Sequence, residues 1–230
     1  MTTKPIIALD FPSKLDVEEF LSEFTEPLFL KVGMELFYQE GPQLIRTLNH
    51  YGHDIFLDLK LHDIPNTVES AMRRIAELGV DMVNVHAAGG LAMMEAAKRG
   101  LAGSGTKLIA VTQLTSTSEE QMQQEQLVSV GLEESVLHYA KLAKQAGLDG
   151  VVCSVHEAKA IGVACGEEFL RVTPGIRPAA SESHDQKRIA TPQDAKIQGA
   201  THIVVGRAIT RSENPQKSYD YINGEWSGRS

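Results

Sequence analysis

The sequence predicts a single-domain α/β fold, a closed (β/α)8 barrel of the TIM type. Eight short apolar runs recur along the 230 residues, helix-like segments separate them, and no Pro- or Ser-rich linker or shift in composition interrupts the middle of the chain. So many alternations in a chain of this length favour a closed barrel over an open doubly wound sheet. We therefore expect one domain over residues 1–230.

The apolar runs are the expected strands. Most of them are rich in Val, Ile and Leu, which is typical of parallel strands that are covered on both faces. In chain order they are PIIALD (5–10), PLFLKVG (27–33), DIFLDLK (54–60), MVNVHAA (82–88), KLIAVTQL (107–114), GVVCSV (150–155), FLRVTPG (169–175) and HIVVGR (202–207).

Amphipathic stretches between these runs predict helices, for example over 68–78, 133–146 and 191–198. Two longer polar segments depart from the regular alternation. The segment 115–130, TSTSEEQMQQEQLVSV, is expected to form an extra short helix over the top of the barrel, and 176–190, which contains IRPAASESHDQKR, is a candidate lid. Because loops that follow the strands of such a barrel build its active site, both segments are expected to be active-site loops.

Composition excludes several classes of partner. The net charge of −8 argues against nucleic acid or an anionic membrane surface, since either would need a basic face. The first residues, MTTKPIIALD, do not resemble a signal peptide, and no apolar run approaches the length of a membrane span. We therefore expect a cytoplasmic protein in which Cys153 and Cys165 are reduced structural thiols, because their spacing fits no zinc site.

The third apolar run carries charges that a buried strand rarely tolerates. Side chains two residues apart in a strand share a face, so Asp58 and Lys60 are expected to point together while Leu57, Leu59 and Leu61 point the other way. Charged groups on an inner face must be paired, and such pairs concentrate at sites that need perturbed ionisation. A purely structural ion pair at a strand end is the alternative explanation.

Polar residues at the ends of other strands are expected to converge on the same mouth of the barrel. The alternation in the first two runs places Asp10 on the face of Ala8 and Lys31 on the face of Phe29. Two lysines and at least two aspartates would then meet in one pocket, where each charge influences the ionisation of its neighbours. The converging residues are Asp10, Lys31, Asp58, Lys60, Gly206 and Arg207.

The last two runs carry a candidate phosphate site. VVGR in run eight and TPGIR in run seven resemble the corner of these barrels in which backbone N–H groups and a helix N-terminus bind a phosphate. Arg207, with Arg177 and Gln186 on the adjacent loop, would supply the positive charge, although Arg207 could instead form a surface salt bridge. In run four, Asn84 and His86 are expected to form hydrogen bonds inside the barrel rather than to bind metal.

Together these motifs resemble the orotidine 5′-phosphate decarboxylase family of the compact bacterial type, and the staphylococcal enzymes in particular. The resemblance covers nearly the whole chain. DLKLHDIPNT, combined with LTS and a final GR, is its most specific part, whereas D-x-K-x-x-D alone is shared with sugar-phosphate decarboxylases and synthases. The blocks that carry it are IIALDF, LFLKVGMELFYQEGP, FLDLKLHDIPNTV, VNVHAAGG, AVTQLTS, VTPGIR and VVGRAIT. Ala208 departs from the family, in which Pro often follows the GR.

The resemblance implies a role for each matching residue. Lys31, Asp58, Lys60 and Asp63 would form a network of alternating charges, with Lys60 as the proton donor to carbon 6 of the pyrimidine. Asp63 and Thr67 would reach the site from the other subunit of a homodimer. The remaining substrate contacts would come from Asp10 and Lys31 at the ribose, Thr115 at the pyrimidine ring, and Arg177, Gln186, Gly206 and Arg207 at the phosphate.

The implied reaction converts orotidine 5′-monophosphate to uridine 5′-monophosphate in de novo pyrimidine biosynthesis, with no cofactor and no metal. Two alternatives remain at this point. One is a metal-dependent decarboxylase or aldolase of the same superfamily that acts on a sugar phosphate, with its aspartates on magnesium. The other is a barrel without catalytic activity that binds a phosphorylated ligand or a partner protein. Lys60 between two acids argues against this second alternative, because a binding protein has little reason to keep so costly an arrangement.

Overall fold

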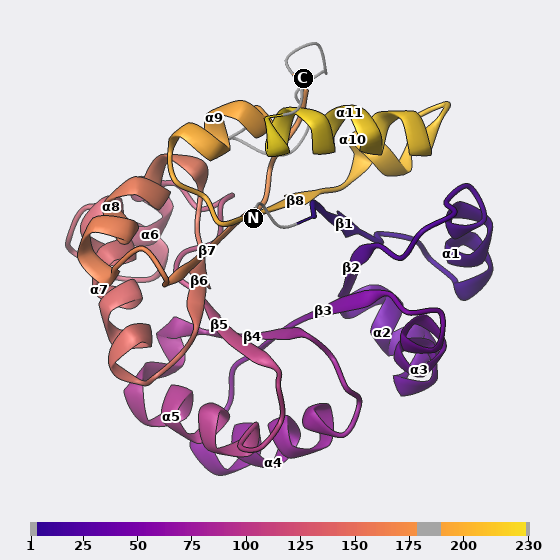
Figure 1. Ribbon diagram of the computed structural model, residues 1–230. Helices are drawn as coiled ribbons and strands as arrows, with labels where there is room; N and C mark the ends of the chain where they lie inside the picture. Colours follow the sequence, from indigo (N-terminus) through magenta and orange to yellow (C-terminus); the bar gives the residue numbers. More distant parts are fainter. Residues whose placement is uncertain (1–3, 179–189, 229–230) are drawn as a thin grey trace.

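The computed structural model describes residues 4–178 and 190–228, and within them eight parallel strands close into a barrel that helices surround (Figure 1). Each strand pairs with the next along the chain, and β1 (Ile6–Ala8) pairs with β8 (His202–Val205) to complete the ring. This arrangement confirms the predicted (β/α)8 barrel. We call the carboxyl-terminal end of the strands the mouth and their amino-terminal end the floor.

Each of the eight predicted runs contains a strand, and most of these strands stop before the run does. The residues after them leave the ladder because the chain turns into the loops that surround the mouth. Only β3 extends past its predicted run, by one residue. Between β1 and β8 the strands are β2 (Phe29–Gly33), β3 (Asp54–Leu61), β4 (Met82–His86), β5 (Lys107–Val111), β6 (Gly150–Val152) and β7 (Leu170–Thr173).

The helices also follow the predicted pattern, and the three amphipathic stretches correspond to α4, α7 and α9 to within about three residues at either end. The helices are α1 (Lys14–Leu21), α2 (Met34–Glu40), α3 (Pro42–His50), α4 (Pro65–Ala76), α5 (Gly90–Gly100), α6 (Glu119–Glu125), α7 (Leu132–Gln145), α8 (Val155–Cys165), α9 (Pro192–Ile197), α10 (Arg207–Thr210) and α11 (Pro215–Ser227), with a 3₁₀ turn η1 (Ala87–Gly89) before α5.

Alternation along the strands divides the core into two layers. Side chains on the outer faces, such as Leu30 and Val32 of β2, pack with the helices in the larger layer. The inner faces fill the barrel with a smaller cluster made of Ile6, Ala8, Phe56, Met82, Ile109, Val172 and Val204. Because this cluster closes the barrel interior below the mouth, polar side chains that follow on the same faces emerge at the mouth.

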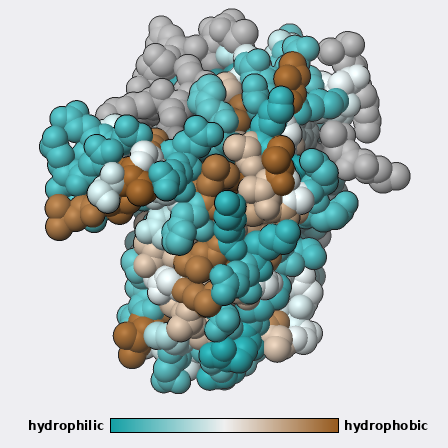
Figure 2. Space-filling model, turned by 90° about the vertical axis from the view of Figure 1, so that its left-hand side faces the viewer, coloured by the Kyte–Doolittle hydropathy of each residue, from teal (hydrophilic) through white to brown (hydrophobic). Residues whose placement is uncertain are grey.

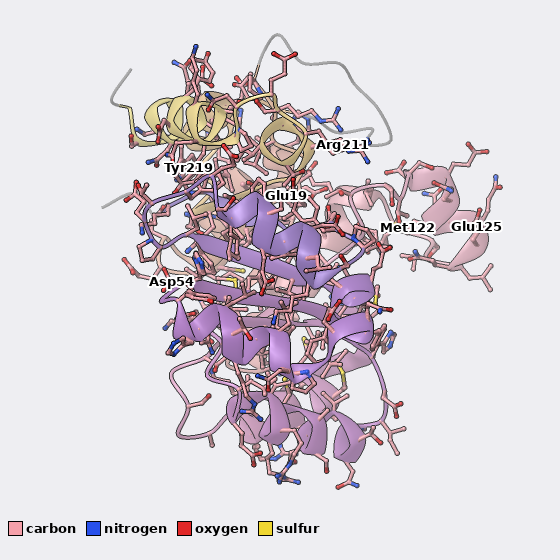
Figure 3. All side chains as sticks on the ribbon, turned by 90° about the vertical axis from the view of Figure 1, so that its right-hand side faces the viewer. Glu19, Asp54, Met122, Glu125, Arg211 and Tyr219 are labelled. Carbon is pink, nitrogen blue, oxygen red and sulfur yellow. The ribbon has the colours of Figure 1, made fainter. Side chains whose placement is uncertain are left out.

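The extra helix predicted within 115–130 is α6. Ser118 caps it: its hydroxyl accepts a hydrogen bond from the Gln121 backbone N–H, and the Gln121 side chain accepts one from the Ser118 backbone N–H. Figure 3 shows the helix that carries Met122 and Glu125 standing out from the barrel on the same side as Arg211. The helix therefore projects from the mouth end of the molecule.

The same pair of features, a glycine and a hydrogen-bonding side chain, recurs at the floor of the barrel. At three strand starts a glycine with positive φ is followed two residues later by a side chain that accepts the backbone N–H of the neighbouring strand. The glycines are Gly79, Gly147 and Gly199, and the side chains are Asp81, Asp149 and Thr201, which accept from Ile55, Leu108 and Arg171 respectively. Each side chain thereby satisfies a donor that would otherwise be left at the end of the ladder.

On the face that α7 and α8 cover, exposed hydrophobic side chains are scattered among hydrophilic ones (Figure 2). In the described ranges 4–178 and 190–228, no helix is both long enough and apolar enough to span a bilayer. Cys153 and Cys165 are buried free thiols.

Candidate active site

A cavity of about 700 Å³ opens at the mouth of the barrel. Its size lies in the range of small-molecule sites. Residues of all eight strands, and of several loops that follow them, contribute to its wall, and they include eight of the residues selected from the sequence. These are Asp10, Lys31, Asp58, Lys60, Thr115, Arg177, Gly206 and Arg207. The expectation that two lysines and two aspartates share one pocket is therefore confirmed.

Asp58 lies at the centre of the charged groups. Its Oδ1 is 2.6 Å from the Lys60 Nζ, and its Oδ2 is 3.4 Å from the Lys31 Nζ. Lys31 also contacts the Oδ1 of Asp10, at 3.3 Å. The order of charges along this chain of contacts is thus Asp10, Lys31, Asp58, Lys60, and each ammonium group has a carboxylate neighbour.

Burial of Asp58 opposes its ionisation, but the ammonium groups of Lys31 and Lys60 and hydrogen bonds from Lys60 and Asn84 outweigh this effect. The net result holds the pKa of Asp58 below its ordinary value. Asp58 is therefore a carboxylate at neutral pH although only 8% of the residue is exposed.

The backbone departs from regular strand geometry at Lys60. Its φ is +50°, in the left-handed region where a side chain with a Cβ costs about 1–2 kcal/mol. Leu57 pairs with Val83 and Leu61 pairs with Val85, so four steps along β3 match two steps along β4. The predicted division of side chains nevertheless holds: Asp58 and Lys60 both line the cavity and touch each other, whereas Leu57, Leu59 and Leu61 pack in the outer layer. The ladder itself is interrupted by a bulge at Lys60, which the alternation did not predict. Strain of this kind at a lysine in a pocket points to a functional site.

Asn84 occupies the space beside this bulge. Its side chain is fully buried, its Oδ1 accepts the Lys60 backbone N–H at 2.8 Å, and its Nδ2 donates to the Asp58 Oδ1 at 2.7 Å. The expectation that Asn84 forms hydrogen bonds inside the barrel is confirmed. His86, on the same strand, lies beside His62 with 5.7 Å between the ring centroids. Burial, helped by His62 and Lys60, lowers the pKa of His86.

The opposite wall of the cavity is cationic. Gly206 precedes α10, and its carbonyl accepts the backbone N–H groups of Ile209 and Thr210. Arg177 and Arg207 line this side of the cavity together with Arg211, which was not selected from the sequence. Arg211 follows Arg207 by four residues, a spacing that brings two side chains to the same face of a helical turn. That spacing was the signal by which it could have been found.

Two of the residues selected from the sequence do not join the cavity in this chain. Asp63 and Thr67 are exposed and do not line it. Asp63 lies between β3 and α4, where its Oδ1 accepts the backbone N–H of Ile64 at 2.6 Å. Gln186 and most of the candidate lid lie outside the described residues.

The arrangement suits electrostatic chemistry more than metal binding. Ammonium nitrogens approach both oxygens of Asp58, and a divalent cation placed there would be repelled by them. Within 4–178 and 190–228, no group of three or more His, Cys, Asp and Glu side chains is arranged to hold a metal ion. What the site offers is a fixed positive field from Lys60, a carboxylate beside it, and a separate cationic wall.

The chain is similar over nearly its whole length to proteins of one family. The model of the orotidine 5′-phosphate decarboxylase / HUMPS family matches residues 3–222. Orotidine 5′-phosphate decarboxylase from Lysinibacillus sphaericus is 62% identical over 98% of this chain and 99% of its own, and the one from Staphylococcus haemolyticus is 61% identical over 99% and 100%. The crystal structure of orotidine 5′-phosphate decarboxylase from Lactobacillus acidophilus superposes with a TM-score of 0.88 at 44% identity, covering 97% of this chain and 98% of that one.

Proposed function

Because this chain belongs to the orotidine 5′-phosphate decarboxylase / HUMPS family, we propose how its own residues perform the reaction for which its relatives are named. This reaction converts orotidine 5′-monophosphate to uridine 5′-monophosphate in pyrimidine biosynthesis. The observation that supports this most strongly is the Lys60 ammonium group, held 2.6 Å from Asp58 at the wall of the mouth cavity.

In the proposed mechanism the bond between carbon 6 and the carboxylate breaks, carbon dioxide leaves, and the electron pair remains on carbon 6. This carbanion lies in the plane of the ring and has no electron sink, so only a preorganised positive charge nearby can stabilise it. Lys60 supplies that charge and then transfers a proton from its Nζ to carbon 6, after which solvent restores the proton on Lys60. No electrons enter or leave the system.

Asp58 is proposed to face the substrate carboxylate. Its low pKa keeps it negative, so it repels that carboxylate in the bound substrate and the repulsion disappears as neutral carbon dioxide forms. Lys31, between Asp10 and Asp58, holds the two carboxylates in place and, with Asp10, is proposed to bind the ribose hydroxyls. Thr115, which lines the cavity, is assigned to the pyrimidine ring.

The phosphate is proposed to bind at the cationic wall, through Arg177, Gly206 and Arg207, and Gln186 is assigned to it by resemblance alone. This wall is separate from the Asp58–Lys60 pair, so the phosphate binds away from the bond that breaks. Its binding energy can still lower the barrier when it orients the substrate and helps to exclude water. The segment 176–190 is proposed as the lid.

We further propose that the enzyme works as a homodimer in the cytoplasm. Asp63 and Thr67 are exposed in the single chain, close in sequence to Asp58 and Lys60, and each would complete the site of the neighbouring subunit. Two buried free thiols fit a reducing compartment.

The proposed reaction is tested by assaying the purified protein with orotidine 5′-monophosphate, with and without a chelator. Since Lys60 supplies the positive charge, turnover is expected to be the same in both conditions. Loss of activity in chelator, restored by magnesium, would instead support the metal-dependent sugar-phosphate enzyme. Absence of turnover in both, with uridine 5′-monophosphate still bound, would indicate a binding protein.

A further inference from the structure

The Asn84 side chain joins the two residues on which the proposed chemistry depends. Its amide oxygen accepts the backbone N–H of Lys60, and its amide nitrogen donates to the same Asp58 oxygen that Lys60 Nζ contacts. These three hydrogen bonds close a ring that runs from the Lys60 backbone through Asn84 and Asp58 to the Lys60 ammonium group. The amide is fully buried, so water does not compete for it.

The orientation of this amide follows from its partners. A backbone N–H can only donate, and an ionised carboxylate can only accept. The oxygen of Asn84 must therefore face Lys60 and its nitrogen must face Asp58. An amide is the neutral group that offers one acceptor and one donor at these two positions, whereas Leu offers neither and an ionised Asp offers no donor.

The bulge in β3 explains why Lys60 needs such a partner. In a regular parallel ladder the backbone N–H of Lys60 would donate to a carbonyl of the neighbouring strand. The register shift between Leu57 and Leu61 interrupts the ladder at this point, and the Asn84 side chain supplies the acceptor instead. The left-handed conformation of Lys60 therefore depends on a side chain of β4.

We propose that Asn84 is a positioning residue that holds the Lys60 backbone in its left-handed conformation and the Asp58 carboxylate against the Lys60 ammonium group. The inference rests on the proposed function, because Lys60 and Asp58 are the groups whose placement it explains. Asn84 acts through these two residues and takes no part in proton transfer itself.

The first test replaces Asn84 with Leu, which has a similar size and cannot form either hydrogen bond. The expected result is a 10- to 100-fold lower kcat with KM changed less than about threefold, because the lost interaction serves the reacting groups more than ground-state binding. Asn49→Leu is the matched control. The Asn49 side chain donates to the carbonyls of Leu78 and Gly79 at the floor, so its loss should lower stability and leave kcat unchanged.

Asn84→Asp gives a sharper test because its effect should depend on pH. A protonated carboxyl group has the shape of the amide and can again donate to Asp58 and accept from Lys60, whereas an ionised one places a second negative charge beside Asp58. The activity of this variant relative to wild type is therefore expected to rise as pH falls through the apparent pKa of the carboxyl pair that Asp58 forms with the introduced side chain. Asn84→Leu should show no such gain.

Other titratable groups face this position and must be common to all the proteins compared. Lys60 lies on β3, Lys31 reaches Asp58 from β2 and contacts Asp10, and His62 and His86 lie beside the pair. Wild type and both variants retain all of them, so the proteins differ only in the side chain at position 84. A ratio for Asn84→Asp that does not change with pH would overturn the proposal, as would an Asn84→Leu kcat within about twofold of wild type.

A measurement without substrate separates this proposal from the proposed reaction. Hydrogen exchange of the Lys60 backbone amide should be slow in wild type and at least tenfold faster in Asn84→Leu, with the amide of Ile55 at the start of β3 unchanged. Unchanged exchange at Lys60 would contradict the positioning role even in an active enzyme. If exchange responds as expected but wild type does not turn over orotidine 5′-monophosphate, the proposed reaction fails and the positioning role stands.

Discussion

The two ends of the barrel use charged side chains in different ways. Figure 3 shows these ends, with Asp54 at the start of β3 on the floor side and Arg211 on the mouth side. At the floor, Asp81 and Asp149 accept backbone N–H groups of the neighbouring strands, and Asp149 also pairs with Lys98 and Lys107. At the mouth, Asp58 contacts the ammonium groups of Lys31 and Lys60 in the wall of a cavity.

The difference extends to buried cations and to the backbone. Arg171, at the start of β7, is 4% exposed and donates to the carbonyls of Gly166, Glu167, Phe169 and Gly199. Positive φ angles at the floor belong to glycines, whereas in the wall of the cavity Lys60 has a positive φ as well as Gly175. The polar groups of the floor therefore serve mainly to hold the backbone, and its positive φ angles fall on glycines, which tolerate them. The mouth instead places charged side chains and a strained lysine in the wall of the cavity. Mutations at the mouth should therefore lower activity, and mutations at the floor should lower stability.

The largest effect is expected from mutations of the charged network at the mouth. Lys60→Ala should lower kcat/KM by at least about 10³-fold, because it removes both the stabilising field and the proton donor. Asp63→Ala should also be nearly inactive if Asp63 serves the neighbouring subunit. When the two inactive proteins are mixed after dissociation, a mixed dimer has one site with both lesions and one with neither. Activity of the mixture against that of each homodimer is the measurement.

Random reassortment makes about half of the dimers mixed, so roughly a quarter of the wild-type site activity should return. The control is each variant taken through dissociation alone, which should recover nothing. If Lys60 and Asp63 acted within one chain, every site would keep a lesion. No recovery, despite subunit exchange demonstrated with labelled chains, would show that the site is not shared.

Two single variants, one with an arginine replaced at the mouth and one with an arginine replaced at the floor, test the contrast between the two ends directly. Arg207→Ala should lower kcat/KM, by an amount that corresponds to about 2–5 kcal/mol of activation free energy, as expected for removing one partner of a charged hydrogen-bonded contact. The free energy of unfolding should change little. Arg171→Met should lower the free energy of unfolding by about 2–4 kcal/mol, because buried carbonyls lose their donor, and leave kcat/KM of the folded enzyme unchanged.

Steady-state kinetics and urea unfolding of both variants provide the measurements. The comparison would fail if Arg171→Met lost kcat/KM at temperatures where it remains fully folded, or if Arg207→Ala lost stability without losing activity.

Much of the architecture could be predicted from the sequence because strand alternation is a local property. The side chains of Ala8 and Phe29 do face the barrel interior, so the positions of Asp10 and Lys31 at the mouth followed from periodicity. The floor also has a readable signal that was not used, since GVD at 79–81 and GLD at 147–149 repeat the glycine and the aspartate at the same spacing.

What could not be predicted depends on contacts between distant residues. No local sequence signal indicates that Lys60 has positive φ, because Asn84, 24 residues away, accepts its N–H. For the same reason the burial of Arg171 was not anticipated, since its acceptors come from the end of α8, the segment after it and the turn before β8. The proposed roles of Asp63 and Thr67 depend on a second chain and came only from resemblance.

The smallest effect concerns a titratable group at the floor. His202 is 8% exposed inside the barrel, with its ring edge-on to Phe29 and its Nδ1 3.0 Å from the Thr201 hydroxyl. Burial lowers the pKa of His202 to about 4. Between pH 6.5 and about 4 the unfolded chain therefore binds a proton at this position that the folded protein does not, and stability falls as the pH falls.

The loss attributable to His202 should be about 1.4 kcal/mol at pH 5.5 and approach roughly 3 kcal/mol near pH 4. The variant His202→Gln, whose side chain cannot titrate, isolates this contribution of His202 to stability. The difference in unfolding free energy between wild type and variant should be constant above pH 7 and shift in favour of the variant below pH 6.5. His53, whose pKa is also lowered by burial, and the carboxylates are common to both proteins and cancel in this difference. A difference that does not depend on pH would mean that water reaches His202 in the folded protein. Because His202 lies at the floor, the pH profile of kcat should be the same in both proteins, whereas a titratable group of the mouth would change it.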